Sequence, residues 1–128
     1  MADIPCVLLV EPDTLIRTPL AEYLRECGYR VLEAFGTAEA RRLLSGGTIA
    51  VDIVLADIDA PDEGGFALAT WIRSAHPGVE VILAGTVERA AERAGALCQD
   101  GPALKKPYEH RLVLDRIKRL LAARKQNE

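Results

Sequence analysis

Short apolar runs of strand length alternate with segments of helical periodicity along the chain, and this alternation restricts the possible fold more than any other feature. Five runs have the length and composition of buried strands: residues 6–10, 30–34, 53–56, 79–84 and 103–105. Each run is followed by a stretch in which apolar residues recur every three or four positions, as on one face of a helix. Repeated strand–helix alternation predicts an α/β protein, with a parallel sheet covered by helices on both faces.

The first helix contains a local conflict. If Asp13 is its N-cap, Pro19 falls inside the helix, where proline removes a hydrogen bond and costs about 3 kcal/mol. Thr18 as N-cap, with Pro19 at the first helical position, is the locally better alternative. We therefore expect a helix that begins near Thr14 but is irregular or kinked before Leu20.

The remaining helices have clearer signals. Thr37 is a good N-cap for the second helix. The third is expected over residues 66–75 and the fourth over residues 87–94. The last carries apolar residues from Val113 onward, and we expect a frayed end after Ala122.

Composition is that of one soluble globular domain, because 49% of the 128 residues are hydrophobic and 27% are charged. We expect a single domain over residues 1–128 without an output domain. The net charge of −3 gives no reason to expect nucleic-acid binding. No apolar run has membrane-spanning length and nothing resembles a signal peptide, so we expect a cytoplasmic protein. Cys6, Cys27 and Cys98 lack metal-ligand spacing and are predicted to be reduced core residues.

Charged residues stand at the ends of three predicted strands. Glu11 follows the first strand, Asp57 follows the third, and Lys106 follows the fifth. The carboxyl ends of parallel strands meet at one edge of a sheet, where open α/β folds place their sites. Phosphoryl transfer to a carboxylate brings anions together, so its site needs a cation and a fixed positive donor. Two acids and a lysine therefore indicate a phosphoryl-accepting site.

Three motifs carry a family resemblance: Glu11-Pro12-Asp13 after the first strand, Asp57-Ile58-Asp59-Ala60-Pro61 after the third, and Lys106-Pro107-Tyr108 after the fifth. In this order and at these separations, the chain resembles the receiver domain of bacterial two-component response regulators, of the single-domain kind that acts in chemotaxis. The resemblance covers essentially the whole chain. It implies a flavodoxin-like, doubly wound sheet of five parallel strands in the order 2-1-3-4-5, flanked by five helices.

The resemblance also implies roles for individual residues. Asp57 would accept a phosphoryl group from a phosphohistidine of a sensor histidine kinase or phosphotransfer protein. Mg²⁺ would be held by Glu11, Asp57 and the backbone carbonyl of Asp59, which are oxygen ligands of the kind this ion prefers. Lys106 would pair with the phosphoryl oxygens, and a cis peptide before Pro107 would aim it. The fourth helix, fifth strand and fifth helix would contact a downstream protein.

The sequence departs from the family pattern at three places. Pro12 replaces the second of two adjacent acids and has no side-chain oxygen, so we hypothesise that Asp59 or Asp13 partly restores the lost charge. Gly85 takes the place of a threonine or serine. The adjacent Thr86 either supplies that switch hydroxyl or caps the following helix. An aromatic residue of the switch is replaced by alanine at position 103.

These departures leave two functional hypotheses. The first is a stand-alone receiver that works in a phosphorelay through Asp57. The second is a degenerate pseudo-receiver that serves as a phosphorylation-independent binding or dimerisation module. An enzyme is not expected, because the chain has no glycine-rich phosphate loop and no nucleophile–base set. A homodimer through the last helix and fifth strand is compatible with the sequence, which does not itself indicate one.

Overall fold

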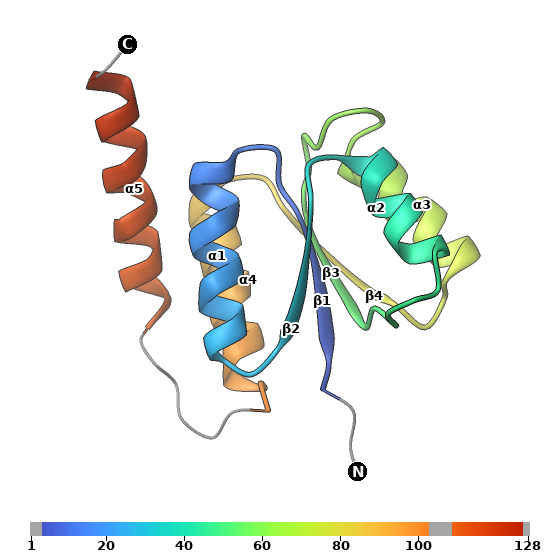
Figure 1. Cartoon of the computed structure of the whole chain (residues 1–128). Helices are drawn as coiled ribbons and strands as arrows, with labels where there is room; N and C mark the ends of the chain where they lie inside the picture. The colour runs from blue at the N-terminus through green and yellow to red at the C-terminus, as the bar shows by residue number, and fades with distance from the viewer. Residues whose placement is uncertain (1–3, 103–108, 127–128) are drawn as a thin grey trace.

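The sheet is parallel and has four strands in the part of the chain that the structure describes. This computed structural model describes residues 4–102 and 109–126. The strands are β1 (Cys6–Val10), β2 (Arg30–Ala34), β3 (Ile53–Asp57) and β4 (Glu80–Ala84). They pair in the order β2-β1-β3-β4 (Figure 1), which confirms the predicted flavodoxin-like arrangement. The strand predicted over residues 103–105 lies outside the described residues.

The central strand β1 shows why the strands read as continuous apolar runs. All five of its residues are buried. Val7 and Leu9 belong to one hydrophobic cluster, and Leu8 and Val10 belong to another. Successive side chains of a strand point to opposite faces, so a strand covered on both sides is apolar at every position. The sheet therefore has a core on each face.

Among residues 4–102 and 109–126, five helices lie on the two sides of the sheet, as the doubly wound prediction requires. One face carries α1 (Thr14–Glu26), α4 (Val87–Gln99) and α5 (His110–Gln126), and the other carries α2 (Thr37–Ser45) and α3 (Gly65–Ala75) (Figure 1). α5 packs on α1 and α4 and forms an outer layer beyond them (Figure 1). The first face is therefore two helices deep.

α4 approaches its neighbours closely because its packed residues are small. Ala90, Ala91, Ala94 and Gly95 are all buried. A Cβ atom on Gly95 would lie 2.8 Å from the Cβ of His110 in α5. Part of α4 and α5 is thus buried between the two helices. The partner surface predicted on the fourth helix, fifth strand and fifth helix excludes that part.

The first helix begins at Thr14, as expected, but Thr18 is not its N-cap. α1 begins at Thr14 with Asp13 as its N-cap, and it continues through Pro19 to Glu26. The Oδ1 of Asp13 accepts a hydrogen bond from the Leu15 N–H at 3.0 Å. Pro19 is itself buried. Tertiary packing of this helix face therefore outweighs the hydrogen bond that proline removes, an effect that local rules cannot include.

Thr37 was predicted as a helix cap, and this was wrong. Gly36 occupies the N-cap position and Thr37 is the first residue of α2. The Thr37 hydroxyl donates to the Pro61 carbonyl at 3.2 Å and accepts from the Glu63 N–H at 3.1 Å. The side chain therefore ties α2 to the loop after β3.

Two helices extend beyond their predicted ends. α4 continues past Gly95 to Gln99, and the missing side chain of Gly95 leaves room for His110 to pack against the helix. α5 continues past Ala122 to Gln126. Arg124, near its end, forms an ion pair with Asp13 at 2.9 Å, which holds the last turn against the start of α1.

The cysteine prediction is right about burial for all three residues and wrong about the reduced state of two of them. Cys6 is buried and forms no disulfide. Cys27 and Cys98 are joined in a disulfide, with their Cα atoms 5.3 Å apart. The two residues are 71 positions apart in the sequence, so only the packing of α1 against α4 brings them together.

Candidate functional site

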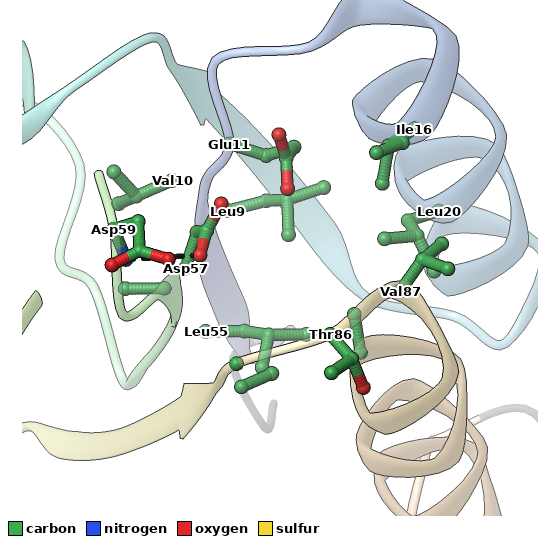
Figure 2. A pocket seen from close by; sticks show the side chains of 14 residues that line it. Leu9, Val10, Glu11, Ile16, Leu20, Leu55, Asp57, Asp59, Thr86 and Val87 are labelled. Atoms are coloured by element: carbon green, nitrogen blue, oxygen red, sulfur yellow. Dashed lines mark hydrogen bonds between the residues drawn. The ribbon is translucent and has the colours of Figure 1, made fainter. Parts of the chain in front are cut away.

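A pocket of about 120 Å³ opens at the carboxyl edge of the sheet, between the ends of β1, β3 and β4 and the first turns of α1 and α4. Its polar side chains are Glu11, Asp57, Asp59 and Thr86 (Figure 2). Apolar residues, among them Leu20, form most of the remaining wall. The structure therefore brings two of the three predicted strand ends to one site, and the third, Lys106, lies outside the described residues together with Pro107.

Asp57 is the last residue of β3 and pairs with Ala84 of β4. Its side chain is half-buried, and its Oδ1 accepts a hydrogen bond from the Asp59 N–H at 3.0 Å. An aspartate that bonds the backbone two residues ahead fixes a turn and its own orientation. The side chain of Asp59 is exposed at the rim of the pocket.

Glu11 is the buried acid of the site, with 8% of its surface exposed. Its Oε2 accepts a hydrogen bond from the Asp13 N–H at 2.8 Å. Burial, reinforced by the negative charges of Asp57 and Asp13, raises the pKa of Glu11 to about 7, although the Asp13 N–H opposes this. Burial disfavours an isolated carboxylate, and a bound cation would reverse that preference.

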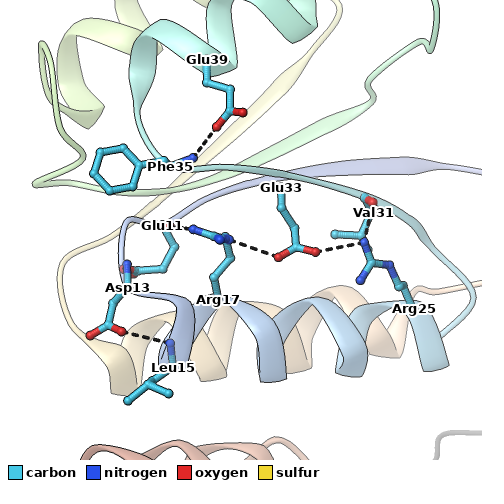
Figure 3. Close-up of polar contacts among 9 residues, drawn as sticks. All are labelled: Glu11, Asp13, Leu15, Arg17, Arg25, Val31, Glu33, Phe35 and Glu39. Atoms are coloured by element: carbon cyan, nitrogen blue, oxygen red, sulfur yellow. Dashed lines mark hydrogen bonds and ion pairs between the residues drawn. The ribbon is translucent and has the colours of Figure 1, made fainter. Parts of the chain in front are cut away.

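Sequence reasoning did not identify Arg17, which holds the backbone of Glu11. Its Nη1 donates to the Glu11 carbonyl at 2.7 Å, and its Nε donates to Glu33 at 3.1 Å (Figure 3). Arg25 donates to the same carboxylate at 3.2 Å and to the Val31 carbonyl at 2.9 Å. These contacts join α1 to β2 and to the end of β1. No local pattern marks such an arginine, because one partner is a backbone carbonyl and the other is a carboxylate on β2.

Asp13 faces away from the pocket. Its carboxylate caps α1 and accepts hydrogen bonds from Arg124 of α5, and it does not line the cavity. Figure 3 shows the side chain turned from Glu11 toward the start of α1. Of the two residues expected to compensate for Pro12, Asp59 is therefore the better placed.

Thr86 acts as the N-cap of α4. Its Oγ1 accepts a hydrogen bond from the Arg89 N–H at 3.1 Å. The hydroxyl points away from Asp57 (Figure 2). Of the two predicted roles, the structure supports the helix cap, while Gly85 lines the pocket beside it.

Replacing Thr86 with alanine should lower the free energy of unfolding by about 1 kcal/mol, because the Arg89 N–H loses its acceptor. Thr86→Ser keeps a hydroxyl at the same position and should lose much less. Urea unfolding of both variants measures the difference, and equal stabilities would contradict the capping role.

Gly65, the residue before the predicted start of the third helix, touches the backbone of the site. Its N–H donates to the Ile58 carbonyl at 2.8 Å. A Cβ atom at this position would lie 2.7 Å from the Asp57 carbonyl oxygen. The pair Gly64-Gly65 at the start of α3 is the sequence signal that could have indicated this close approach.

No helix among residues 4–102 and 109–126 has both the length and the apolar character that crossing a membrane requires.

Comparison with known proteins identifies the family to which this architecture belongs. The family model of the response regulator receiver domain matches residues 7–118. Transcriptional regulatory protein GltR of Pseudomonas aeruginosa is 34% identical over 119 residues, which cover 90% of this chain and 48% of GltR. TorCAD operon transcriptional regulatory protein TorR of Escherichia coli K12 is 27% identical over 115 residues, 90% of this chain and 49% of TorR. The chain thus spans about half the length of these relatives.

Solved structures agree with the family match. The non-phosphorylated HemR receiver domain from Leptospira biflexa has 29% identity and a TM-score of 0.58, covering 91% of this chain and 94% of that chain. A response regulator receiver domain protein from Clostridium thermocellum shares the fold at 20% identity, with a TM-score of 0.60 and coverage of 98% and 100%. The sheet order, the acidic edge and the nearly full-length match lead to one conclusion: this chain belongs to the response regulator receiver domain family.

Proposed function

We propose that the chain accepts a phosphoryl group on Asp57 from the phosphohistidine of a sensor histidine kinase or phosphotransfer protein. One observation carries the proposal. Asp57, at the carboxyl end of β3, shares a single cavity with the buried carboxyl group of Glu11. Membership of the receiver family supports a role in signal transduction. The signal would pass onward through protein contacts.

The chain's own groups suit this transfer. The hydrogen bond from the Asp59 N–H holds Oδ1 of Asp57 and leaves Oδ2 to attack phosphorus. As the new O–P bond forms, the N–P bond of phosphohistidine breaks, and the imidazole nitrogen keeps the bonding pair and takes up a proton. The apolar wall around Leu20 limits access of water to the reacting groups.

The donors present fit a magnesium ion. Glu11 and Asp57 supply carboxylate oxygens and Asp59 supplies a backbone carbonyl, all hard oxygen ligands. Within the described ranges, no three His, Cys, Asp or Glu side chains form a ready metal cluster. Mg²⁺ usually keeps several waters and binds phosphate oxygens, so one or two carboxylate ligands from the protein are sufficient. When bound, the ion neutralises charge that develops between the acceptor and the phosphoryl group. Pairing of Lys106 with that group stays a prediction.

Phosphorylation is tested by intact mass. Incubating the chain with Mg²⁺ and an acyl phosphate should add the mass of one phosphoryl group, and Asp57→Asn should abolish the gain. Asp115→Asn is the matched control, because Asp115 lies on the exposed side of α5 and its loss should leave the gain intact. A mass gain that survives in Asp57→Asn would refute Asp57 as the acceptor.

The second hypothesis, a pseudo-receiver that acts only by binding, also has a supporting observation. Pro12 offers no ligand, and Asp13 is engaged with α1 and Arg124 rather than with the pocket. A correctly folded chain that gains no mass from any phosphoryl donor would favour this function. In either case the accessible parts of α4 and α5 remain the proposed contact surface for a target protein or a second copy.

A further inference from the structure

The disulfide between Cys27 and Cys98 fastens the end of α4 to the end of α1. Cys27 is the C-cap residue of α1, and Cys98 lies in the last turn of α4. The residues are 1% and 2% exposed. The disulfide joins residues 71 positions apart. Closing so long a loop lowers the conformational entropy of the unfolded chain.

Further contacts at the same end depend on the position of α4. The Tyr29 hydroxyl donates to the Leu97 carbonyl at 2.6 Å. At Gly101 the chain passes so close to α1 that a Cβ atom would lie 2.6 Å from the Cys27 carbonyl oxygen. These contacts surround the disulfide and would weaken together if α4 moved away.

The opposite end of α4 forms part of the acidic pocket. Thr86, Val87 and Ala90 line the same cavity as Glu11 and Asp57 (Figure 2). α4 has 13 residues, and a helix of that length spans about 20 Å. One continuous helix therefore connects the disulfide to the pocket wall.

The placement of α4 is one that chain topology alone does not favour. α3 connects the parallel strands β3 and β4 and lies on the face opposite α1 (Figure 1). Crossovers between parallel strands are almost always right-handed. A further strand beside β4 would therefore need α4 on the face of α3, whereas α4 packs on the face of α1. The disulfide is the covalent restraint on this arrangement.

From these observations we infer that Cys27–Cys98 is a redox site: a dithiol reductant cleaves it, releases the C-terminal end of α4 from α1, and thereby alters the acidic pocket. The sequence leads us to expect a cytoplasmic protein, and disulfides in such reducing compartments are usually transient and either catalytic or redox-sensing. The receiver family works with phosphorelay proteins, so the pocket effect rests on the proposed function, whereas the release of α4 does not.

The chemistry is a thiol–disulfide exchange. A thiolate of the reductant attacks one of the two sulfurs, the Cys27–Cys98 bond breaks, and the other cysteine leaves as a thiolate. The second thiol of the reductant then attacks the reductant sulfur of the mixed disulfide. The bond between that sulfur and the cysteine breaks, and the cysteine leaves as a thiolate. Two electrons pass to the protein, the reductant leaves as a disulfide, and two protons end on the cysteine thiols. Because both sulfurs are buried, attack requires opening of the last turn of α4.

Hydrogen–deuterium exchange of the full chain, with and without dithiothreitol, tests the inference. Reduction should add the mass of two hydrogen atoms. It should speed exchange in peptides covering residues 87–102 by about tenfold or more, while those from α2 and α3 stay unchanged. Cys6→Ser keeps the disulfide and should respond like the parent chain. The double variant Cys27→Ser, Cys98→Ser should show the faster exchange without reductant.

The outcomes separate the two proposals. Equal exchange of α4 in the oxidised and reduced chain would overturn the redox inference, as would free thiols at Cys27 and Cys98 after oxidation in air. If the double variant does not fold, reduction of the parent chain provides the same comparison. If exchange changes as expected but neither form is phosphorylated on Asp57, the redox site stands and the proposed function fails. If both hold, the phosphorylation rate should differ between the two forms.

Discussion

Replacing Glu11 with glutamine should stabilise the metal-free protein above pH 7 and leave its stability unchanged below pH 4.5. Burial raises the pKa of this carboxyl from 4.5 to about 7 in the folded protein. Between these values the folded state holds a proton that the unfolded chain has lost, so stability falls as pH rises through this window and is lowest above it. The difference between the two pKa values corresponds to a loss of stability on the order of 3 kcal/mol above this window. Glutamine keeps an oxygen acceptor for the Asp13 N–H.

Urea unfolding at pH 8 and pH 4.5 measures this effect. Glu92→Gln controls for net charge, because Glu92 lies exposed on α4. Adding excess Mg²⁺ at pH 8 should stabilise the parent chain and have less effect on Glu11→Gln, since the ion would bind the charged form of Glu11. A Glu11→Gln variant with the same midpoint as the parent chain at both pH values would show that Glu11 carries no burial penalty.

The second large effect should come from Gly65→Ala. A methyl group at this position would lie 2.7 Å from the Asp57 carbonyl oxygen, 3.0 Å from the Ile58 Cα and 3.2 Å from a Leu83 methyl. Two of these neighbours are backbone atoms at the end of β3 and the start of the following loop, which cannot rotate away as a side chain would. We expect a loss of about 2–3 kcal/mol in the free energy of unfolding. Because the displaced backbone includes Asp57 itself, phosphorylation should also slow.

Gly78→Ala is the matched control, because a methyl group there would meet no atom within 4 Å. That change should be neutral or stabilising by about 0.5 kcal/mol, through the lower entropy of the unfolded chain. Thermal unfolding of the two variants gives the comparison. If Gly65→Ala proved as stable as Gly78→Ala, the loop after β3 would have room that the structure does not show.

The strands could be predicted from the sequence because burial on both faces leaves a direct signal. β1 and β2 begin and end at the predicted residues, while β3 extends one residue further and β4 begins one residue later. Pro19 and Thr37 were misread for a common reason. Their roles depend on residues far away in the chain, through packing at Pro19 and through the loop at Pro61 for Thr37.

The candidate site was predictable where it lies at strand ends. Glu11 and Asp57 meet in one pocket because parallel strands end at a common edge. Arg17 could not be found in this way, because it acts through a carbonyl on its own loop and a carboxylate on β2. The pairing of Cys27 with Cys98 required knowing that α4 packs beside α1, and the periodicity of a helix does not reveal which face of the sheet it covers.

The outer position of α5 makes its attachment sensitive to ionic strength. In the described part of the chain, three ion pairs join it to α1, to the N-cap residue of α1 and to α4: Arg116 with Glu22 at 3.2 Å, Arg124 with Asp13 at 2.9 Å, and Lys118 with Glu88 at 3.4 Å. Apart from that of Asp13, these side chains are about half exposed, so dissolved salt screens the attraction within the pairs. The buried contacts of Val113 and Ile117 are not screened in this way. Salt therefore weakens the ion pairs at the edges of this outermost helix, while its buried apolar contacts and the packing of the sheet are retained.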